Sequence, residues 1–106
     1  GPQDAIAEMR DAYQARRDFM VRELNAMPGV VCRSIEGTFY LFPSFPQSGK
    51  NSVELADSLL EKAGIAATPG AAFGASGEGH VRFAISTAMS ELERAVARLA
   101  PVSAQI

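Results

Sequence analysis

The feature that most constrains the fold is a seven-residue run, His80 to Ser86, in which apolar and polar or small residues alternate around one charge. Successive side chains of an extended strand point to opposite faces of the sheet. Val81, Phe83 and Ile85 therefore form one apolar face. Arg82 falls on the other face, among small neighbours. The alternation predicts a strand that buries one side and leaves open space above Arg82.

Arg82 is the first candidate for binding chemistry. A guanidinium group is planar, permanently charged and able to bind a carboxylate or phosphate through two parallel hydrogen bonds. The preceding segment, Thr68 to Gly79, is rich in glycine and has few bulky side chains. This pattern favours an anion-binding arginine in a cleft. The alternative is an arginine on an exposed sheet face that pairs with a nearby carboxylate, and the residues alone leave both readings open.

Composition points to a single folded domain over residues 1–106, with 47% hydrophobic and 21% charged residues. The net charge of −2 argues against a nucleic-acid or anionic-membrane partner, because both require clustered positive charge. No apolar run approaches the roughly 20 residues that span a membrane. Cys32 is the single cysteine, so an internal disulfide is excluded, and we expect a reducing, cytoplasmic location.

The chain begins with Gly1-Pro2 instead of methionine. This dipeptide is either the remnant of a cleaved tag or native sequence. In both cases we expect the chain to begin inside a longer polypeptide.

Periodicity predicts three helices and four strands. The helices are expected at about 3–27, 51–63 and 90–100, and the strands at 30–33, 37–43, 65–67 and 80–86. The order is helix, strand, strand, helix, strand, strand, helix. We therefore predict an α+β fold, a small, mostly antiparallel sheet with helices packed on one face.

Local signals set the helix ends. Asn51 with Glu54 predicts a cap for the second helix, and Ser90 with Glu93 predicts an S-x-x-E capping box for the third. Residues 34–37 are expected to form a hairpin loop. Residues 102–106 are expected to form a frayed tail.

Other chemistry finds little support. The glycine-rich loop is followed by a strand and lacks a P-loop lysine, so a connecting loop is favoured over a phosphate-binding loop. His80 is the single histidine, which excludes a catalytic triad around another base and gives no metal-ligand spacing. Cys32 is expected to pack in an apolar strand. Lys50 and Lys62 lie in a linker and near a helix end, where neither suits a Schiff base.

Four blocks together resemble the class I/II aminotransferases that depend on pyridoxal phosphate. They are Pro28-Gly29-Val30, Gly37-Thr38-Phe39-Tyr40-x-Phe42-Pro43, Thr68-Pro69-Gly70-x-x-Phe73-Gly74 and Gly77-Glu78-Gly79-x-Val81-Arg82-Phe83-Ala84. They follow one another with familiar spacing and cover nearly the whole chain. The resemblance is to the carboxy-terminal small domain of an aspartate-aminotransferase-like enzyme.

The resemblance implies roles for particular residues. In that family the arginine of the G-E-G-x-V-R block binds the α-carboxylate of the amino-acid substrate, which makes Arg82 the expected substrate-binding residue. Phe39 is implied as a wall of the substrate site. Gly70 and Phe73 belong to a loop that helps to define the cleft. His80 stands where an aromatic residue is common in the family, and its role stays open.

The resemblance also implies what lies elsewhere. The lysine, the aspartate and the phosphate-binding residues that hold pyridoxal phosphate belong to the large domain, and no segment here matches them. We expect a full-length homodimer that acts on an amino acid and a 2-oxo acid, with no cofactor bound to this fragment and no activity of the fragment alone. Two other readings remain: a non-enzymatic, ferredoxin-like module that binds amino acids for regulation, and a structural dimerisation domain.

Overall fold

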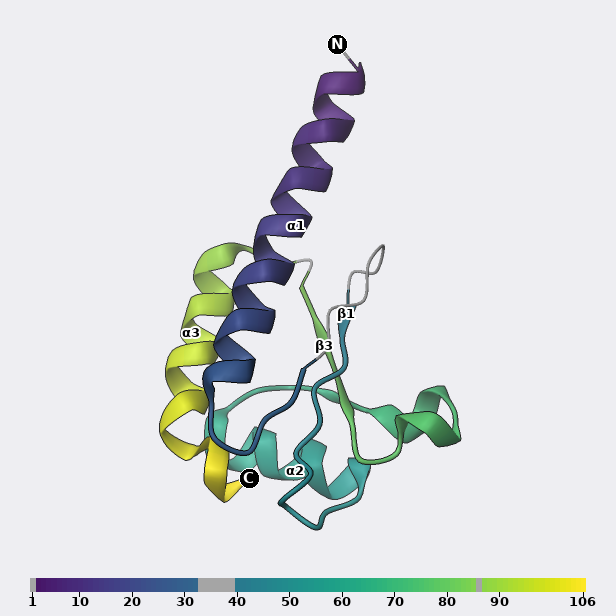
Figure 1. The fold of residues 1–106 in the computed structure, drawn as a ribbon, viewed down its shortest axis with the longest axis vertical. Helices are drawn as coiled ribbons and strands as arrows, with labels where there is room; N and C mark the ends of the chain where they lie inside the picture. The colour runs from purple at the N-terminus through teal and green to yellow at the C-terminus, as the bar shows by residue number, and fades with distance from the viewer. Residues whose placement is uncertain (1, 33–39, 86) are drawn as a thin grey trace.

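The computed structural model describes residues 2–32, 40–85 and 87–106, with side chains described from residue 5 onward. These ranges form an α+β domain with a small antiparallel sheet, as predicted (Figure 1). The elements in chain order are α1 (Pro2–Ala26), β1 (Tyr40–Leu41), α2 (Ser52–Ala63), β2 (Thr68–Pro69), the 3-10 helices η1 (Gly70–Phe73) and η2 (Ala75–Gly77), β3 (Val81–Ala84), α3 (Met89–Leu99) and the 3-10 helix η3 (Ala100–Gln105).

The strand that carries Arg82, β3, is the centre of the sheet. It pairs antiparallel with β1, with Tyr40 opposite Ala84, and with β2, with Thr68 opposite Arg82. Val81 and Phe83 are buried, whereas Ala84 is exposed and Arg82 is half-buried. The predicted alternation of faces is therefore confirmed.

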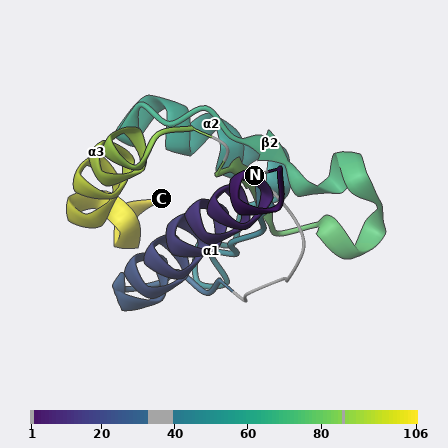
Figure 2. The same ribbon diagram turned by 90° about the horizontal axis from the view of Figure 1, so that it is seen from above.

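The helices cover the apolar face of the sheet and share one core with it. Helices α1 and α3 lie side by side, and α2 packs against β2 and α3 (Figures 1 and 2). Burial of these apolar side chains is the main favourable contribution to folding. The largest fully buried apolar side chains are Met20, Leu24, Leu41, Pro43, Leu55, Leu59, Val81, Ile85 and Leu99.

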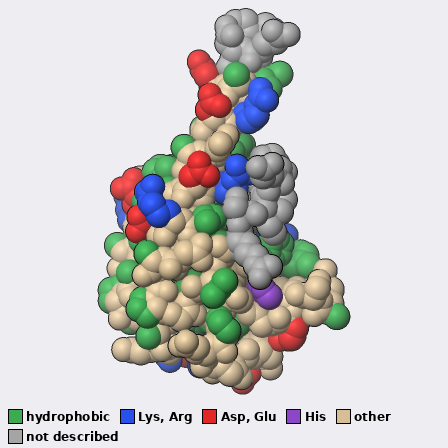
Figure 3. All heavy atoms as spheres, viewed as in Figure 1, with side chains coloured by type: hydrophobic (Ala, Val, Ile, Leu, Met, Phe, Trp, Pro, Cys, Tyr) green, Lys and Arg blue, Asp and Glu red, His purple; other side chains and the backbone are tan. Residues whose placement is uncertain are grey.

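Helix α1 differs along its length. Its second half buries Met20 and Leu24, whereas its first half projects away from the rest of the domain (Figure 1). On that projecting half Ile6 and Met9 are 61% and 62% exposed. Acidic and basic side chains are also displayed along this part of the helix (Figure 3). The periodically spaced apolar residues of this helix thus meet the core only over its second half.

The two predicted helix caps have different outcomes. At α2 the Asn51 side chain accepts from the Glu54 amide at 2.9 Å, and the Glu54 carboxylate accepts from the Asn51 amide at 3.0 Å. This capping box confirms the prediction. The prediction of a capping box at Ser90 and Glu93 is wrong, because α3 begins at Met89, after Ala88, and Ser90 already lies within its first turn.

The predicted strands are shorter than expected or displaced. Of the strand at 30–33, the described part forms one bridge, from Val31 to Ser44. The strand at 37–43 is reduced to β1 in its described part, where Pro43 has no amide hydrogen to extend a ladder. The strand at 65–67 is wrong, since the Ile65 amide donates to the Leu59 carbonyl at 3.2 Å and completes the end of α2. The predicted hairpin loop at 34–37 lies outside the described residues.

The prediction that residues 102–106 form a frayed tail is also wrong. Residues 100–105 form η3, and the Ile106 side chain is only 2% exposed. The Ser58 hydroxyl donates to the Ile106 carbonyl at 3.1 Å, and the Ser103 hydroxyl donates to the Pro28 carbonyl at 3.1 Å. These contacts hold the segment against α2 and against the turn that follows α1.

Candidate functional site

Arg82 lies between two aromatic rings that come from different parts of the chain. Its guanidinium carbon is 4.2 Å from the centre of the Tyr40 ring and 4.3 Å from that of the Phe73 ring. Tyr40 reaches it because the pairing of β1 with β3 sets Tyr40 diagonally across from Arg82, within reach of a long side chain. Both rings attract the cation through their π faces.

The donor atoms of Arg82 have no protein acceptor in the part of the chain that the structure describes, where its guanidinium makes no hydrogen bond or ion pair. Contact with an aromatic ring uses the face of the guanidinium and leaves the N–H groups, which point outward in its plane, able to donate. The reading in which Arg82 pairs with a neighbouring carboxylate of this chain is therefore not supported by the described residues.

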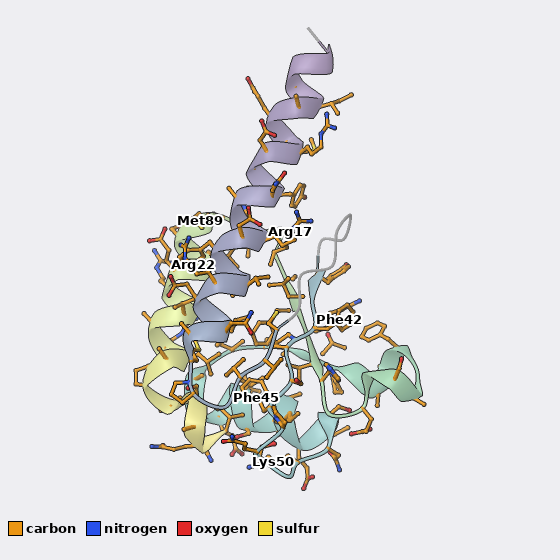
Figure 4. All side chains as sticks on the ribbon, viewed as in Figure 1. Arg17, Arg22, Phe42, Phe45, Lys50 and Met89 are labelled. Carbon is orange, nitrogen blue, oxygen red and sulfur yellow. The ribbon has the colours of Figure 1, made fainter. Side chains whose placement is uncertain are left out.

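Phe73 comes from the glycine-rich loop, which contains η1 and η2 and projects from the side of the domain opposite α3 (Figures 1 and 2). The Phe73 ring is 48% exposed and meets the edge of the Phe42 ring, with the two ring centres 6.2 Å apart. Phe42 extends from the chain after β1, whereas Phe45 points into the core (Figure 4). The open space expected above Arg82 is thus partly occupied by aromatic side chains.

Gly70 lies at the base of this loop, where its two arms meet. Its backbone is in contact with that of Gly77, and its amide donates to the His80 carbonyl at 2.8 Å. A β-carbon at position 70 would collide with the Gly77 carbonyl oxygen and would lie 2.6 Å from that of His80. The loop closes at its base only because both positions are glycine.

The structure brings together three of the four predicted site residues: Arg82, Phe73 and, as the base of the loop, Gly70. Phe39 lies outside the described residues. Tyr40 was missed, although the register of β1 with β3 places it at Arg82. His80 is half-buried, and its ring nitrogen Nδ1 lies 3.2 Å from the Glu78 carbonyl oxygen, a local contact within the loop.

Other candidate chemistry is weak. Burial raises the pKa of the Cys32 thiol from 9.0 to about 11, so it stays protonated near neutral pH and does not act as a nucleophile. Lys62 donates to the Gln105 carbonyl at 2.7 Å on the surface, and Lys50 lies at the outer edge of the domain before α2 (Figure 4). Among the described residues no cluster of histidine, cysteine and carboxylate side chains suits a metal ion.

A sequence profile of the family "Aminotransferase class I and II" matches residues 2–99. The chain belongs to this family. It is 39% identical to an aspartate aminotransferase of Pyrococcus horikoshii over 95 residues, which is 90% of this chain and 24% of that protein. It is 37% identical to an LL-diaminopimelate aminotransferase of Moorella thermoacetica over 106 residues, which is 27% of that protein.

Solved structures agree with this assignment. The aromatic aminotransferase of Pyrococcus horikoshii superposes with a TM-score of 0.90 at 37% identity, over 97% of this chain and 27% of that one. The aspartate aminotransferase of Rhizobium meliloti gives 0.84 at 35% identity, over 95% of this chain and 27% of that one. The chain therefore spans about a quarter of the length of its relatives.

Membership of this family disfavours the two other readings, a ferredoxin-like regulatory module and a structural dimerisation domain. In addition, no helix in the described ranges is long and apolar enough to cross a membrane.

Proposed function

We propose that this chain is the carboxy-terminal small domain of an aminotransferase, and that Arg82 binds the α-carboxylate of the amino-acid and 2-oxo-acid substrates. The observation that carries the proposal is the environment of the Arg82 guanidinium, which has aromatic neighbours but no acceptor for its N–H groups among the described residues. These neighbours are the rings of Tyr40 and Phe73.

The chemistry of this arrangement suits a carboxylate. Two parallel N–H donors match the two oxygens of the carboxylate, and a charge-assisted pair of this kind is stronger than a neutral hydrogen bond. The apolar rings beside it limit the access of water, which strengthens the ion pair that a substrate forms. Binding there would orient the α-carbon toward groups outside this chain.

The relatives support the choice of the α-carboxylate as ligand. Those that match this segment are named for aspartate, for aromatic amino acids and for LL-diaminopimelate. These compounds differ in their side chains but share an α-amino and an α-carboxylate group. A segment common to all of these enzymes is best suited to bind a group that their substrates share.

The family implies pyridoxal phosphate as the cofactor of the full-length enzyme, where it withdraws electrons from the substrate's α-carbon. The described residues of this chain do not fit a covalent site for it, because Lys62 is bound to the Gln105 carbonyl and Lys50 lies at the outer edge, away from β3 (Figure 4). We therefore expect the cofactor to be held by the large domain, and the 106-residue chain to be inactive alone.

The inactivity of the isolated chain is tested by adding pyridoxal phosphate and an amino acid to it and recording the absorbance spectrum. We expect the spectrum of free pyridoxal phosphate, with no stable band of lysine-bound cofactor and no formation of 2-oxo acid. A stable band accompanied by turnover would overturn this part of the proposal.

The role of Arg82 is tested in the full-length enzyme, which we expect to be a homodimer, with the variants Arg82→Lys and Arg82→Gln. Losing the two-pronged ion pair should lower kcat/KM by a factor equivalent to about 2–5 kcal/mol, the range for breaking a desolvated charge pair. The control is Arg94→Lys, because Arg94 is an exposed arginine that pairs with Glu91 on α3. Unchanged kinetics in both Arg82 variants would exclude the proposed role.

A further inference from the structure

Glu78, an exposed residue that follows η2, is hydrogen-bonded to the start of α2. Its carboxylate oxygen Oε1 accepts from the Ser52 amide at 2.7 Å. Ser52 is the first residue of α2, so its amide is one of the helix's four N-terminal donors without a partner inside the helix. The positive end of the helix dipole favours a carboxylate at this place.

Ser52 also holds the other arm of the loop. Its side chain is fully buried, and its hydroxyl oxygen accepts from the Ala71 amide at 3.3 Å. Ala71 lies in η1, before Phe73, and Glu78 lies just after η2. We call the Glu78–Ser52 and Ser52–Ala71 hydrogen bonds the Ser52 clip. The clip fixes both arms of the glycine-rich loop to one residue of α2.

In the sequence Phe73 lies between Ala71 and Glu78, the two loop residues that bind Ser52, and its own side chain makes few packing contacts. Its ring is nearly half exposed, and its ring contacts among the described residues are with Phe42 and Arg82. The place of the Phe73 ring over Arg82 is therefore set by the backbone of the loop. The contact between Gly70 and Gly77 makes the two arms one unit, so a shift of the clip would move Phe73 as well.

We propose that Glu78 is a positioning residue for carboxylate binding: through the Ser52 clip it holds Phe73 against Arg82, and so fixes the orientation of the guanidinium. This inference rests on the proposed function of Arg82. Glu78 is not expected to touch the substrate. It acts through Ser52 and the loop.

The chain offers a matched control in Glu54. This carboxylate also binds the start of α2, but its partner is the Asn51 amide, and among the described residues it makes no hydrogen bond to the glycine-rich loop. Replacing Glu54 should weaken the same helix end without releasing the loop. A change that appears with Glu78 and not with Glu54 therefore reports on positioning and not on helix stability.

The experiment measures KM for both substrates, kcat and the melting temperature of the full-length enzyme with Glu78→Ala, Glu78→Gln, Ser52→Ala and Glu54→Ala. For Glu78→Ala we expect KM to rise about twofold to fivefold, no more than loss of the Phe73 ring itself would cause, with kcat within twofold. Ser52→Ala, which removes only the bond to Ala71, should raise KM about twofold to threefold. Glu78→Gln should restore KM to within twofold of the wild type, because its amide oxygen still accepts from Ser52. Glu54→Ala should lower the melting temperature and leave KM unchanged.

A double-mutant comparison separates this inference from the proposed function. In an Arg82→Gln background, Glu78→Ala should change KM less than twofold, because no guanidinium remains to be oriented. If Arg82→Gln is strongly impaired while Glu78→Ala and Ser52→Ala keep the wild-type KM, the positioning role is wrong and the role of Arg82 stands. An equal rise in KM for Glu54→Ala also overturns the positioning role. If Arg82→Gln itself behaves as wild type, the proposed function fails.

Discussion

The backbones of Gly70 and Gly77 cross in direct contact at the base of the loop that carries Phe73. Each glycine occupies space that a β-carbon of the other would need, so neither position accepts a side chain without a shift of the backbone. The Gly70 amide adds a hydrogen bond to the His80 carbonyl at 2.8 Å. This crossing links the start of β3, and hence Arg82, to the loop above it.

Gly70→Ala should destabilise the domain and disturb the site together. The new methyl group meets backbone atoms, which yield less readily than a flexible side chain, so we expect a loss of about 3 kcal/mol in the free energy of unfolding. The control is Gly49→Ala, which has open space around it and a left-handed conformation, at φ 69°, and should lose only about 1–2 kcal/mol. Urea denaturation of the 106-residue chain gives both values. In the full-length enzyme, only Gly70→Ala should raise KM. If Gly70→Ala and Gly49→Ala lose the same free energy of unfolding and Gly70→Ala leaves KM unchanged, the proposed role of the Gly70–Gly77 contact is wrong.

Phe73→Ala should weaken substrate binding with little effect on stability. An exposed cation–π contact contributes about 0.5–1 kcal/mol, so we expect KM in the full-length enzyme to rise about twofold to fivefold. Leu60→Ala is the control, because Leu60 is a similarly exposed apolar residue, 58% exposed, on α2. A rise in KM of the same size in both variants would show that the effect is not specific to the ring over Arg82.

The features that the sequence predicted correctly depend on neighbours within a few residues. Alternation alone identified the buried face of β3, and Asn51 with Glu54 signalled a cap because both partners lie within three residues. The Ser90–Glu93 pattern failed because the helix begins two residues earlier than predicted, with Ala88 and not Ser90 at its N-cap. A local motif states that a cap can form, but the rest of the fold decides where the helix begins.

The features that sequence analysis missed depend on contacts between distant positions. Tyr40 reaches Arg82 only through the register of β1 against β3. The Glu78 carboxylate meets Ser52 across 26 residues of sequence. Ile106, which ends the segment expected to be frayed, is held by Ser58, 48 residues away. No pattern within one segment contains this information.

Ile106→Ala should test whether the last segment is structural. Truncating a buried isoleucine costs about 2–5 kcal/mol, and we expect the lower end of this range because the site lies at the edge of the core. Gln105→Ala, an exposed neighbour whose carbonyl and not its side chain binds Lys62, should change the free energy of unfolding by less than about 0.5 kcal/mol. Urea denaturation of the 106-residue chain measures both. If the two variants are equally stable, Ile106 does not contribute to the core.

Cys32 should make the domain less stable at high pH. Burial raises the pKa of its thiol from 9.0 to about 11, so between these values the unfolded chain loses the thiol proton while the folded chain keeps it. Stability rises with pH only where the unfolded state binds more protons, and here it binds fewer, so this contribution is complete below pH 9 and is lost as the pH approaches 11. The measurement is urea denaturation of the wild type and of Cys32→Val, which keeps a similar volume and cannot ionise, at pH values from 8 to about 11. The wild-type free energy of unfolding should fall relative to that of the variant above pH 9. A constant difference across the range would mean that the thiol ionises as readily in the folded chain as in the unfolded one.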